Sequence, residues 1–196
     1  MYGHKRRVMV CTLAGLLPTL AAAFAETSSA IEYRVLATTK TSTMEKELNE
    51  AAADGYRFRD VMGGETGFGG SEVVVVVSRD PGSPVEGRFR YKLLATSKTS
   101  TMQKELQEAS DAGYEVVGQT VFSTTFGGDE VVVILQRDAR NPEVSYEYHL
   151  LATTKTGTME KELREAGEAG YDLVGLTVSK TAYGASELVS ILRRAR

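Results

Sequence analysis

Hydrophobic and polar positions follow the same order three times along the chain. Each copy begins with a segment that alternates like a strand, as in residues 33–38, and continues with apolar residues at helical spacing. A second alternating segment and a nearly all-apolar segment complete the copy. The first copy lies 58 residues before the second, and the second lies 57 residues before the third. Because such a period marks tandem supersecondary units, the sequence predicts three β-α-β-β repeats.

The helical segment of each repeat follows a lysine–threonine motif and carries one apolar stripe. In the first repeat the stripe occupies positions i, i+4, i+7 and i+8, and its members are Met44, Leu48, Ala51 and Ala52. Thr43 or Ser42 is placed to cap the N–H groups at the helix start, with Glu45 near the positive end of the helix dipole. A glycine then fits the left-handed position that ends a helix, and these glycines are Gly55, Gly113 and Gly170.

The last segment of each repeat is almost wholly apolar and contains many β-branched residues, at 73–77, 131–135 and 188–192. Such a run predicts a central strand that is covered on both faces. With a helix over one face, each repeat is predicted to be an α+β unit, a three-stranded mixed sheet with one helix. The other face of the sheet needs a partner, so we expect the three units to pack with pseudo-threefold symmetry. A continuous side-by-side sheet is the alternative.

Residues 1–25 have the pattern of a signal peptide. Three basic residues at positions 5–7 precede an apolar run at 8–20 that is too short to span a bilayer, and Ala23 and Ala25 are the small residues that signal peptidase accepts. Cleavage would leave Glu26 at the amino terminus, and an uncleaved membrane anchor is the alternative. We therefore expect an exported protein, periplasmic or secreted. Its repeats are predicted at residues 31–80, 89–138 and 146–196.

Charge and composition limit the functions open to the exported protein. Removing residues 1–25, which contain three basic and no acidic residues, changes the formal net charge from −3 to −6. No basic run remains, so nucleic acid is not an expected partner. No later apolar stretch is long enough for membrane insertion. The single cysteine, Cys11, is removed with the signal peptide, so the fold must be stabilised by burial without disulfides.

Side chains that serve catalysis and metal binding are scarce in the exported protein. His149 is its only histidine and occurs in one repeat only. Without cysteine and with one histidine, a zinc site of the usual ligand types cannot form within one chain. Glu47 and Glu50 could form a carboxylate pair for acid–base chemistry, but they also fit a solvated helix face that balances Lys46. We therefore expect no enzyme, no catalytic residue, no metal and no cofactor.

A short motif recurs at the second strand of the repeats. It reads Gly-Tyr-Glu-Val-Val at 113–117 and Gly-Tyr-Asp-Leu-Val at 170–174. With the tyrosine-containing first strand, the short helix and the arginine-ended last strand, it resembles a small bacterial domain family of unknown function. That family carries a Gly-Trp-Glu-Leu-Val element, in which tyrosine here replaces tryptophan. The resemblance covers nearly all of the exported chain and implies three tandem copies of a β-α-β-β fold, with no established activity.

The lysine–threonine motif before each helix is the candidate binding site. N–H groups at a helix N-terminus attract anions, and a neighbouring lysine adds positive charge. The candidate anion-binding residues are Lys40, Thr41, Thr43, Lys98, Thr99, Thr101, Lys155, Thr156 and Thr158. The simpler interpretation assigns these threonines to capping and these lysines to solubility.

The function we expect is that of a non-enzymatic binding or scaffold module. It would be a monomer with internal pseudo-threefold packing, and its partner would be an unknown protein. The alternative is a protein that binds a small molecule or a small anionic ligand at the three lysine–threonine motifs.

Overall fold

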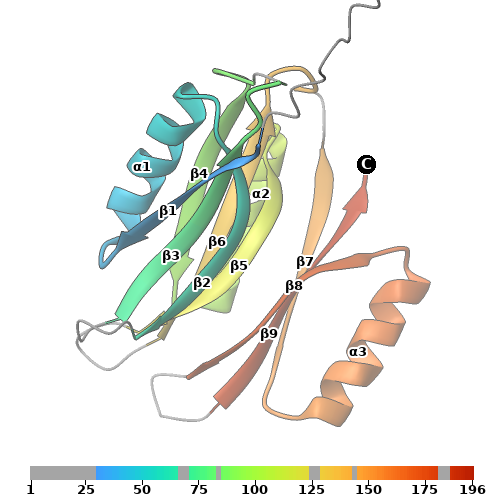
Figure 1. The fold of residues 1–196 in the computed structure, drawn as a ribbon. Helices are drawn as coiled ribbons and strands as arrows, with labels where there is room; N and C mark the ends of the chain where they lie inside the picture. Colours follow the sequence, from blue (N-terminus) through green and yellow to red (C-terminus); the bar gives the residue numbers. More distant parts are fainter. Residues whose placement is uncertain (1–29, 66–70, 83–84, 124–128, 143–144, 181–185) are drawn as a thin grey trace, which may run out of the picture.

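The computed structural model describes residues 30–65, 71–82, 85–123, 129–142, 145–180 and 186–196. The predicted signal peptide lies outside these residues. Each repeat forms a strand, a helix and two further strands in the predicted order, and we name the repeats units 1, 2 and 3 (Figure 1).

The bounds of the elements correspond closely between units. Unit 1 contains β1 (Glu32–Thr38), α1 (Thr41–Ala53), β2 (Arg57–Glu65) and β3 (Ser71–Arg79). Unit 2 contains β4 (Phe89–Thr96), α2 (Thr99–Asp111), β5 (Glu115–Ser123) and β6 (Asp129–Asp138). Unit 3 contains β7 (Tyr146–Thr153), α3 (Thr156–Glu168), β8 (Asp172–Lys180) and β9 (Ser186–Ala195).

Each unit is an α+β fold in which one helix accompanies an antiparallel three-stranded sheet. The last strand lies in the middle, in the orders β1-β3-β2, β4-β6-β5 and β7-β9-β8. Both of its neighbours run antiparallel to it, so the prediction of a mixed sheet is wrong. Because of the helix, the second strand runs parallel to the first. The last strand lies between these two, so they do not pair with each other. In the described part of the chain the three sheets are separate, which also contradicts a continuous side-by-side sheet.

The helices α1 and α2 bury the predicted apolar stripe, whereas α3 buries only Met159 and Ala166 of it, and all three helices begin earlier than predicted. Met44 and Leu48 have no exposed surface. The residue before each helix is a lysine without a side-chain cap, so the prediction of capping by Thr43 or Ser42 is wrong. Instead, a threonine at the end of the first strand accepts the N–H of that lysine, as Thr38 does at 3.2 Å in unit 1. The glycines that end the helices have the predicted positive φ, and they are Gly55, Gly113 and Gly170.

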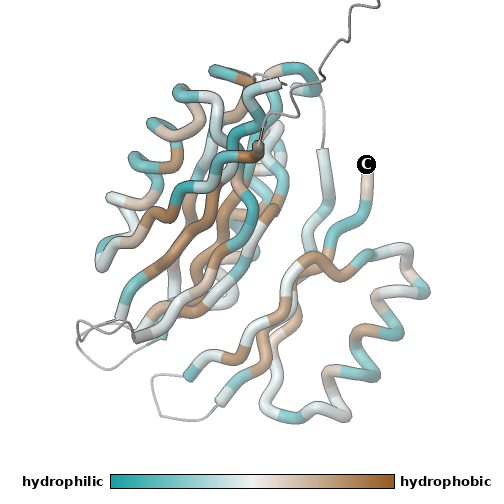
Figure 2. The backbone as a smooth tube through the Cα atoms, viewed as in Figure 1, coloured by the Kyte–Doolittle hydropathy of each residue, from teal (hydrophilic) through white to brown (hydrophobic). Residues whose placement is uncertain are grey.

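Successive units are joined by one repeated interface. Besides contacting its own sheet, α1 packs on β4 of unit 2, and α2 packs likewise on β7 of unit 3. The second strands also meet, β2 with β5 and β5 with β8. Because side chains of the middle strand alternate, Val133 faces α2 whereas Val132 and Ile134 belong to the core shared with unit 1. Figure 2 shows apolar residues concentrated on the middle strands.

Among the described residues, the outer sides of units 1 and 3 make no interface of this kind (Figure 1). All the large hydrophobic residues that are exposed in the described ranges lie in units 1 and 3. We call the exposed set of unit 1 the head face, and it consists of Ile31, Tyr33, Val35 and Met62. We call the exposed set of unit 3 the tail face, and it consists of Leu173, Leu176 and Val178.

Candidate functional site

Two of the predicted anion-binding residues line a cavity between units 2 and 3. Lys98 and Thr99, at the start of α2, form one wall of a space of about 270 Å³. Other walls come from the beginning of β6, from β7 and from the adjacent ends of β8 and β9. The apolar part of the lining consists of Met102, Val131, Leu150 and Val189. The interface between units therefore leaves room for a small molecule beside a helix N-terminus.

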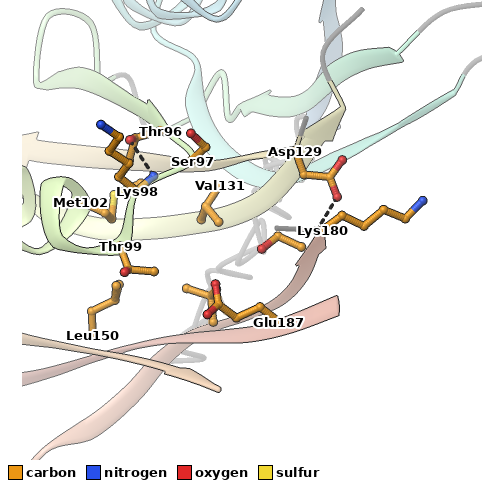
Figure 3. A pocket seen from close by; sticks show the side chains of 12 residues that line it. Thr96, Ser97, Lys98, Thr99, Met102, Asp129, Val131, Leu150, Lys180 and Glu187 are labelled. Atoms are coloured by element: carbon orange, nitrogen blue, oxygen red, sulfur yellow. Dashed lines mark hydrogen bonds between the residues drawn. The ribbon is translucent and has the colours of Figure 1, made fainter. Parts of the chain in front are cut away.

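The rim of this cavity carries charges of both signs. Lys98 and Lys180 contribute ammonium groups, whereas Asp129 and Glu187 contribute carboxylates (Figure 3). The two lysine side chains extend to opposite sides of the cavity. Asp129 also accepts the backbone N–H of Lys180 at 2.7 Å, which fixes the end of β8 against β6. Two cations and two carboxylates cancel formally, so the cavity suits a small polar or zwitterionic molecule as well as an anion.

The same motif has different surroundings in the other units. Thr41 lines a more open cleft of about 330 Å³ together with Glu45 and Glu105, whose carboxylates oppose anion binding. Three copies of one sequence motif therefore do not form three equal sites. The other six predicted residues line neither of these spaces, and they are Lys40, Thr43, Thr101, Lys155, Thr156 and Thr158.

Polar helix residues bind the backbone of the following unit, a role the sequence analysis missed. Glu45, expected to act on the helix dipole, lies beyond the first turn and accepts the N–H of Leu93 at 2.8 Å. The Oδ1 of Asn49 accepts the N–H of Tyr91 at 3.0 Å, and its Nδ2 donates to the Tyr91 carbonyl at 2.9 Å. The sequence signal for this role was Asn49 itself, an uncharged amide next to Leu48 of the apolar stripe. The residues at these two positions in α2 bind β7, and they are Gln103 and Gln107.

A tyrosine of the first strand also crosses each interface. The hydroxyl of Tyr91 accepts the N–H of Phe58 at 2.8 Å, and that of Tyr148 accepts the N–H of Val116 at 2.8 Å. Both amides lie where β2 and β5 shift register against the middle strand. Burial raises the pKa of Tyr91 to about 12 and also raises the pKa of Tyr148. The third tyrosine of this kind, Tyr33, is 66% exposed on the head face.

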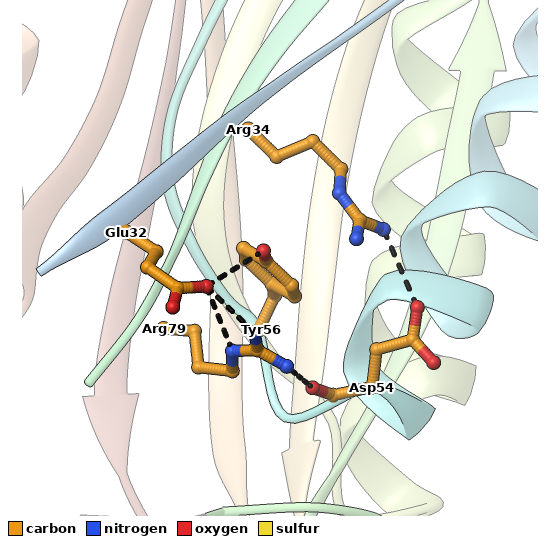
Figure 4. Close-up of polar contacts among 5 residues, drawn as sticks. All are labelled: Glu32, Arg34, Asp54, Tyr56 and Arg79. Carbon is orange, nitrogen blue, oxygen red and sulfur yellow. Dashed lines mark hydrogen bonds and ion pairs between the residues drawn. The ribbon is translucent and has the colours of Figure 1, made fainter. Parts of the chain in front are cut away.

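A second recurring polar cluster holds the C-terminal end of the helix in units 1 and 3. In unit 1, Arg79 donates to Glu32 at 2.6 Å and to the carbonyl of Asp54 at 3.2 Å (Figure 4). Tyr56 donates to the same carboxylate at 3.3 Å, and the guanidinium of Arg34 lies 4.2 Å from its ring centre. The hydrogen bond from Arg79 is the main cause of the lowered pKa of Glu32. The corresponding residues of unit 3 are Glu147, Tyr171 and Arg194.

The remaining candidate groups occupy ordinary surface positions. His149 is exposed, with its ring centre 5.6 Å from that of Tyr171. Glu50 pairs with Lys46 at 3.7 Å on the solvated side of α1, as predicted. Within the described ranges, no three His, Cys, Asp or Glu side chains come together in a way that could hold a metal ion. None of the helices described there combines the length and apolar character needed to cross a membrane.

No protein-family model, curated protein or solved structure matches this chain. The resemblance to the small bacterial domain family therefore rests on the motif at 113–117 and 170–174 and on the order of elements.

Proposed function

We propose that this chain is an exported, non-enzymatic repeat protein that acts as a binding or scaffold module. The observation that carries the proposal is the placement of the exposed large hydrophobic residues: in the described ranges, four lie on the head face and three on the tail face. Contiguous apolar surface of this kind is typical of interaction sites. The terminal units of a repeat array normally carry a polar outer face, whereas the outer faces of units 1 and 3 are apolar.

The groups with perturbed pKa values support binding over catalysis. Burial raises the pKa of Tyr91, whose hydroxyl joins two units. Hydrogen bonds from Arg88 lower the pKa of Asp138, and one from Arg79 lowers that of Glu32. Each of these groups is engaged in a contact that holds the fold together, whereas a catalytic group must face its substrate.

The amino-terminal pattern supports export to the periplasm or the exterior. Residues 1–25 combine a basic start, a short apolar run and small residues before the expected cleavage point. Amino-terminal sequencing of protein recovered outside the cytoplasm is expected to begin at Glu26. An intact Met1 on exported protein would contradict this part of the proposal.

The predicted pseudo-threefold packing is the alternative use of the head and tail faces. A third interface of the kind that joins units 1 and 2 would place the tail face on a head face. Such packing within one chain would cover the apolar residues of both ends and leave neither face free for a partner.

A photo-crosslinking residue at Leu176 tests the binding role in cells that export the protein. We expect a covalent adduct of higher mass, because Leu176 is 52% exposed on the tail face. The same probe at Lys104, on the solvated side of α2, is the matched control and is expected to give no adduct. Exported, folded protein without any adduct at Leu176 would contradict binding through this face.

The cavity between units 2 and 3 favours a second candidate function, the binding of a small molecule with an anionic group. Lys98 and the N-terminus of α2 would hold that group, and the apolar lining would contact the rest of the molecule. One exposed helix end contributes only about 0.3–1 kcal/mol. Binding of inorganic phosphate alone is therefore expected in the millimolar range.

Amide chemical shifts measured during a phosphate titration test this second candidate. We expect the amides of residues 102–104 to move, and Lys98→Ala to remove that movement without changing the melting temperature. Lys155→Ala is the control, since Lys155 does not line the cavity. Unmoved amides at 102–104, or an unaffected response in Lys98→Ala, would contradict an anion site at this cavity.

A further inference from the structure

The head face corresponds to the surface that units 2 and 3 present to the unit before them. Tyr33 occupies the repeat position of Tyr91 and Tyr148, each of which is only 3% exposed. Ile31 occupies the position of Phe89, which is buried in the core shared by units 1 and 2. The head face therefore has the apolar residues of a unit–unit interface, and none of the described residues covers them as a preceding unit would.

The tail face corresponds to the surface that units 1 and 2 present to the unit after them. Val178 occupies the position of Gly63, whose N–H donates to Thr120 of the next unit at 2.7 Å. Leu176 occupies the position of Gln119, whose amide donates to a threonine of β8 at 2.8 Å. In unit 3 both positions are aliphatic and exposed, so this half of the interface is more apolar than its counterpart in unit 2.

The polar groups of the two ends also correspond to hydrogen-bond partners of the interface inside the chain. Glu160 occupies the position of Glu45, which accepts a backbone N–H of the next first strand. The equivalent N–H on the head face belongs to Val35. The hydroxyl of Tyr33 is likewise the counterpart of the two tyrosine hydroxyls that accept the N–H groups at the register shifts of β2 and β5. The equivalent N–H group in β8 belongs to Leu173.

We infer that the tail face of one copy docks on the head face of a second copy, repeating head to tail the interface inside the chain. The inference rests on the proposed binding role and names its partner. It follows from continuity: the interface is formed twice within the chain, and its two unused halves lie at opposite ends. Such a contact between unlike faces leads to a ring or to an open chain of copies.

Asp60, on the same side of unit 1 as the head face, departs from the repeated interface and lowers the affinity of one copy for the next. Units 2 and 3 carry Gly118 and Gly175 at this position, because a Cβ would lie 2.6 Å from Phe58 and 2.0 Å from Gln119 of the preceding unit. In unit 1 the position holds an aspartate on the exposed sheet face. Docking must displace or desolvate this carboxylate, which opposes association. The contact between copies is therefore weak, and Asp60 limits it.

Sedimentation velocity of the exported form, residues 26–196, tests this inference. We expect the average mass to rise with protein concentration between about 10 μM and about 1 mM. Asp60→Gly is expected to tighten association at least about tenfold, and Val178→Asp to abolish it. Lys104→Asp, on the solvated side of α2, is the control for added negative charge. A monomer throughout this range in both wild type and Asp60→Gly would overturn the inference.

Single cysteines identify which faces meet, since the exported chain contains none. Met62 occupies the position of Thr120 and Val178 that of Gly63, so docking brings the Met62 and Val178 positions together. Mixing Met62→Cys protein with Val178→Cys protein under oxidising conditions is expected to give a covalent dimer. Mixing Val178→Cys with Lys104→Cys gives only a background level.

The cysteine pair also separates docking between copies from closure within one chain. Both cysteines in a single chain at low concentration are expected to remain reduced or to link two chains. A monomer with an internal disulfide would show that unit 3 covers unit 1 of its own chain and would overturn docking of a second copy. A monomeric protein whose Leu176 probe captures a different protein would overturn self-docking yet leave the proposed binding role intact.

Discussion

The first strands of units 1 and 2 have closely similar sequences in opposite environments. Tyr91 in β4 is 3% exposed and bonded to Phe58, whereas Tyr33 in β1 is 66% exposed. The difference does not arise within each unit, since both strands pair antiparallel with a valine-rich middle strand in the same register. It arises because α1 and β2 of unit 1 pack against unit 2, whereas no described residue takes the corresponding place against unit 1. Burial in this protein is thus determined by the neighbouring unit.

This comparison also separates two kinds of surface on each repeat. One side of the middle strand packs on the helix of its own unit in all three copies. The other side is buried only where a preceding unit exists, as shown by Ile134 at 0% exposure and by the partly exposed Val76 at the same position. Stability should therefore depend on nearest-neighbour contacts as well as on each unit's own core.

The largest predicted difference concerns this pair of positions. Ile134→Ala creates a cavity in the core shared by units 1 and 2 and is expected to reduce the free energy of unfolding by about 2–5 kcal/mol. Val76→Ala, at the same repeat position on the exposed side of unit 1, is expected to cost less than about 1 kcal/mol. Urea unfolding measures both values. Equal costs would show that unit 1 is covered by a partner under the conditions used.

The tyrosines provide the next comparison. Tyr148→Phe removes the acceptor of the buried Val116 amide and is expected to destabilise by about 1–3 kcal/mol, the cost of an unsatisfied buried group. Tyr33→Phe at low protein concentration should change stability by less than about 0.5 kcal/mol. Thermal unfolding of the two variants beside wild type checks this order. A Tyr33→Phe variant as unstable as Tyr148→Phe would contradict an open head face.

Substitutions of the glycines at the helix ends are expected to differ less in their effect on stability. Gly113→Ala and Gly170→Ala both place a Cβ at positive φ, which costs about 1–2 kcal/mol. At Gly113 the added Cβ would also lie 2.7 Å from the carbonyl of Pro142 in the segment that leads to unit 3. At Gly170 its nearest neighbour is the flexible Arg194 side chain at 3.5 Å. We expect the lower melting temperature for Gly113→Ala, and the reverse order would contradict this account.

The smallest expected effect is on the pH dependence of stability, and it distinguishes unit 3 from unit 2. Hydrogen bonds from Tyr171 and Arg194 lower the pKa of Glu147 from its ordinary value of 4.5. A lowered folded-state pKa stabilises the protein above about pH 4.5, and this stabilisation is lost as the pH falls through the folded-state pKa. Unit 2 carries Arg90 at the same position. Glu147→Gln should flatten the acid side of the stability profile slightly, less so at high salt, whereas Arg90→Gln should not.

The sequence predicted the features that depend on residues close together in the chain. The buried stripe that includes Met44 follows from helical spacing, and the positive φ of Gly55 follows from the need to end a helix before a strand. The middle position of the last strand was predicted from its continuous apolar run and is confirmed, but the antiparallel pairing of all the strands was not predicted. A helix crossover fixes the relative direction of two strands, but it does not decide whether a third strand enters between them.

The contacts between units could not be predicted because they join residues distant in sequence. Asn49 and Tyr91 lie 42 positions apart, and nothing local to either residue indicates the other. The cap prediction failed because the helix begins at Thr41, so the cap position belongs to Lys40, whose side chain makes no capping bond. The lysine–threonine motif was recognised as a candidate site, but its surroundings come from neighbouring units. In the described part of the chain, those neighbours form a cavity of about 270 Å³ at Lys98 and Thr99.

Hydrogen exchange at the amide of Leu173 tests most directly whether the two ends are halves of one interface. The corresponding amides, of Phe58 and Val116, donate to tyrosine hydroxyls of the next unit, and Tyr33 of a second copy is the counterpart for Leu173. We predict that protection of Leu173 increases with protein concentration, and increases further in Asp60→Gly, while protection of Phe58 and Val116 stays constant. An exchange rate at Leu173 that does not change with concentration in either protein would contradict the account.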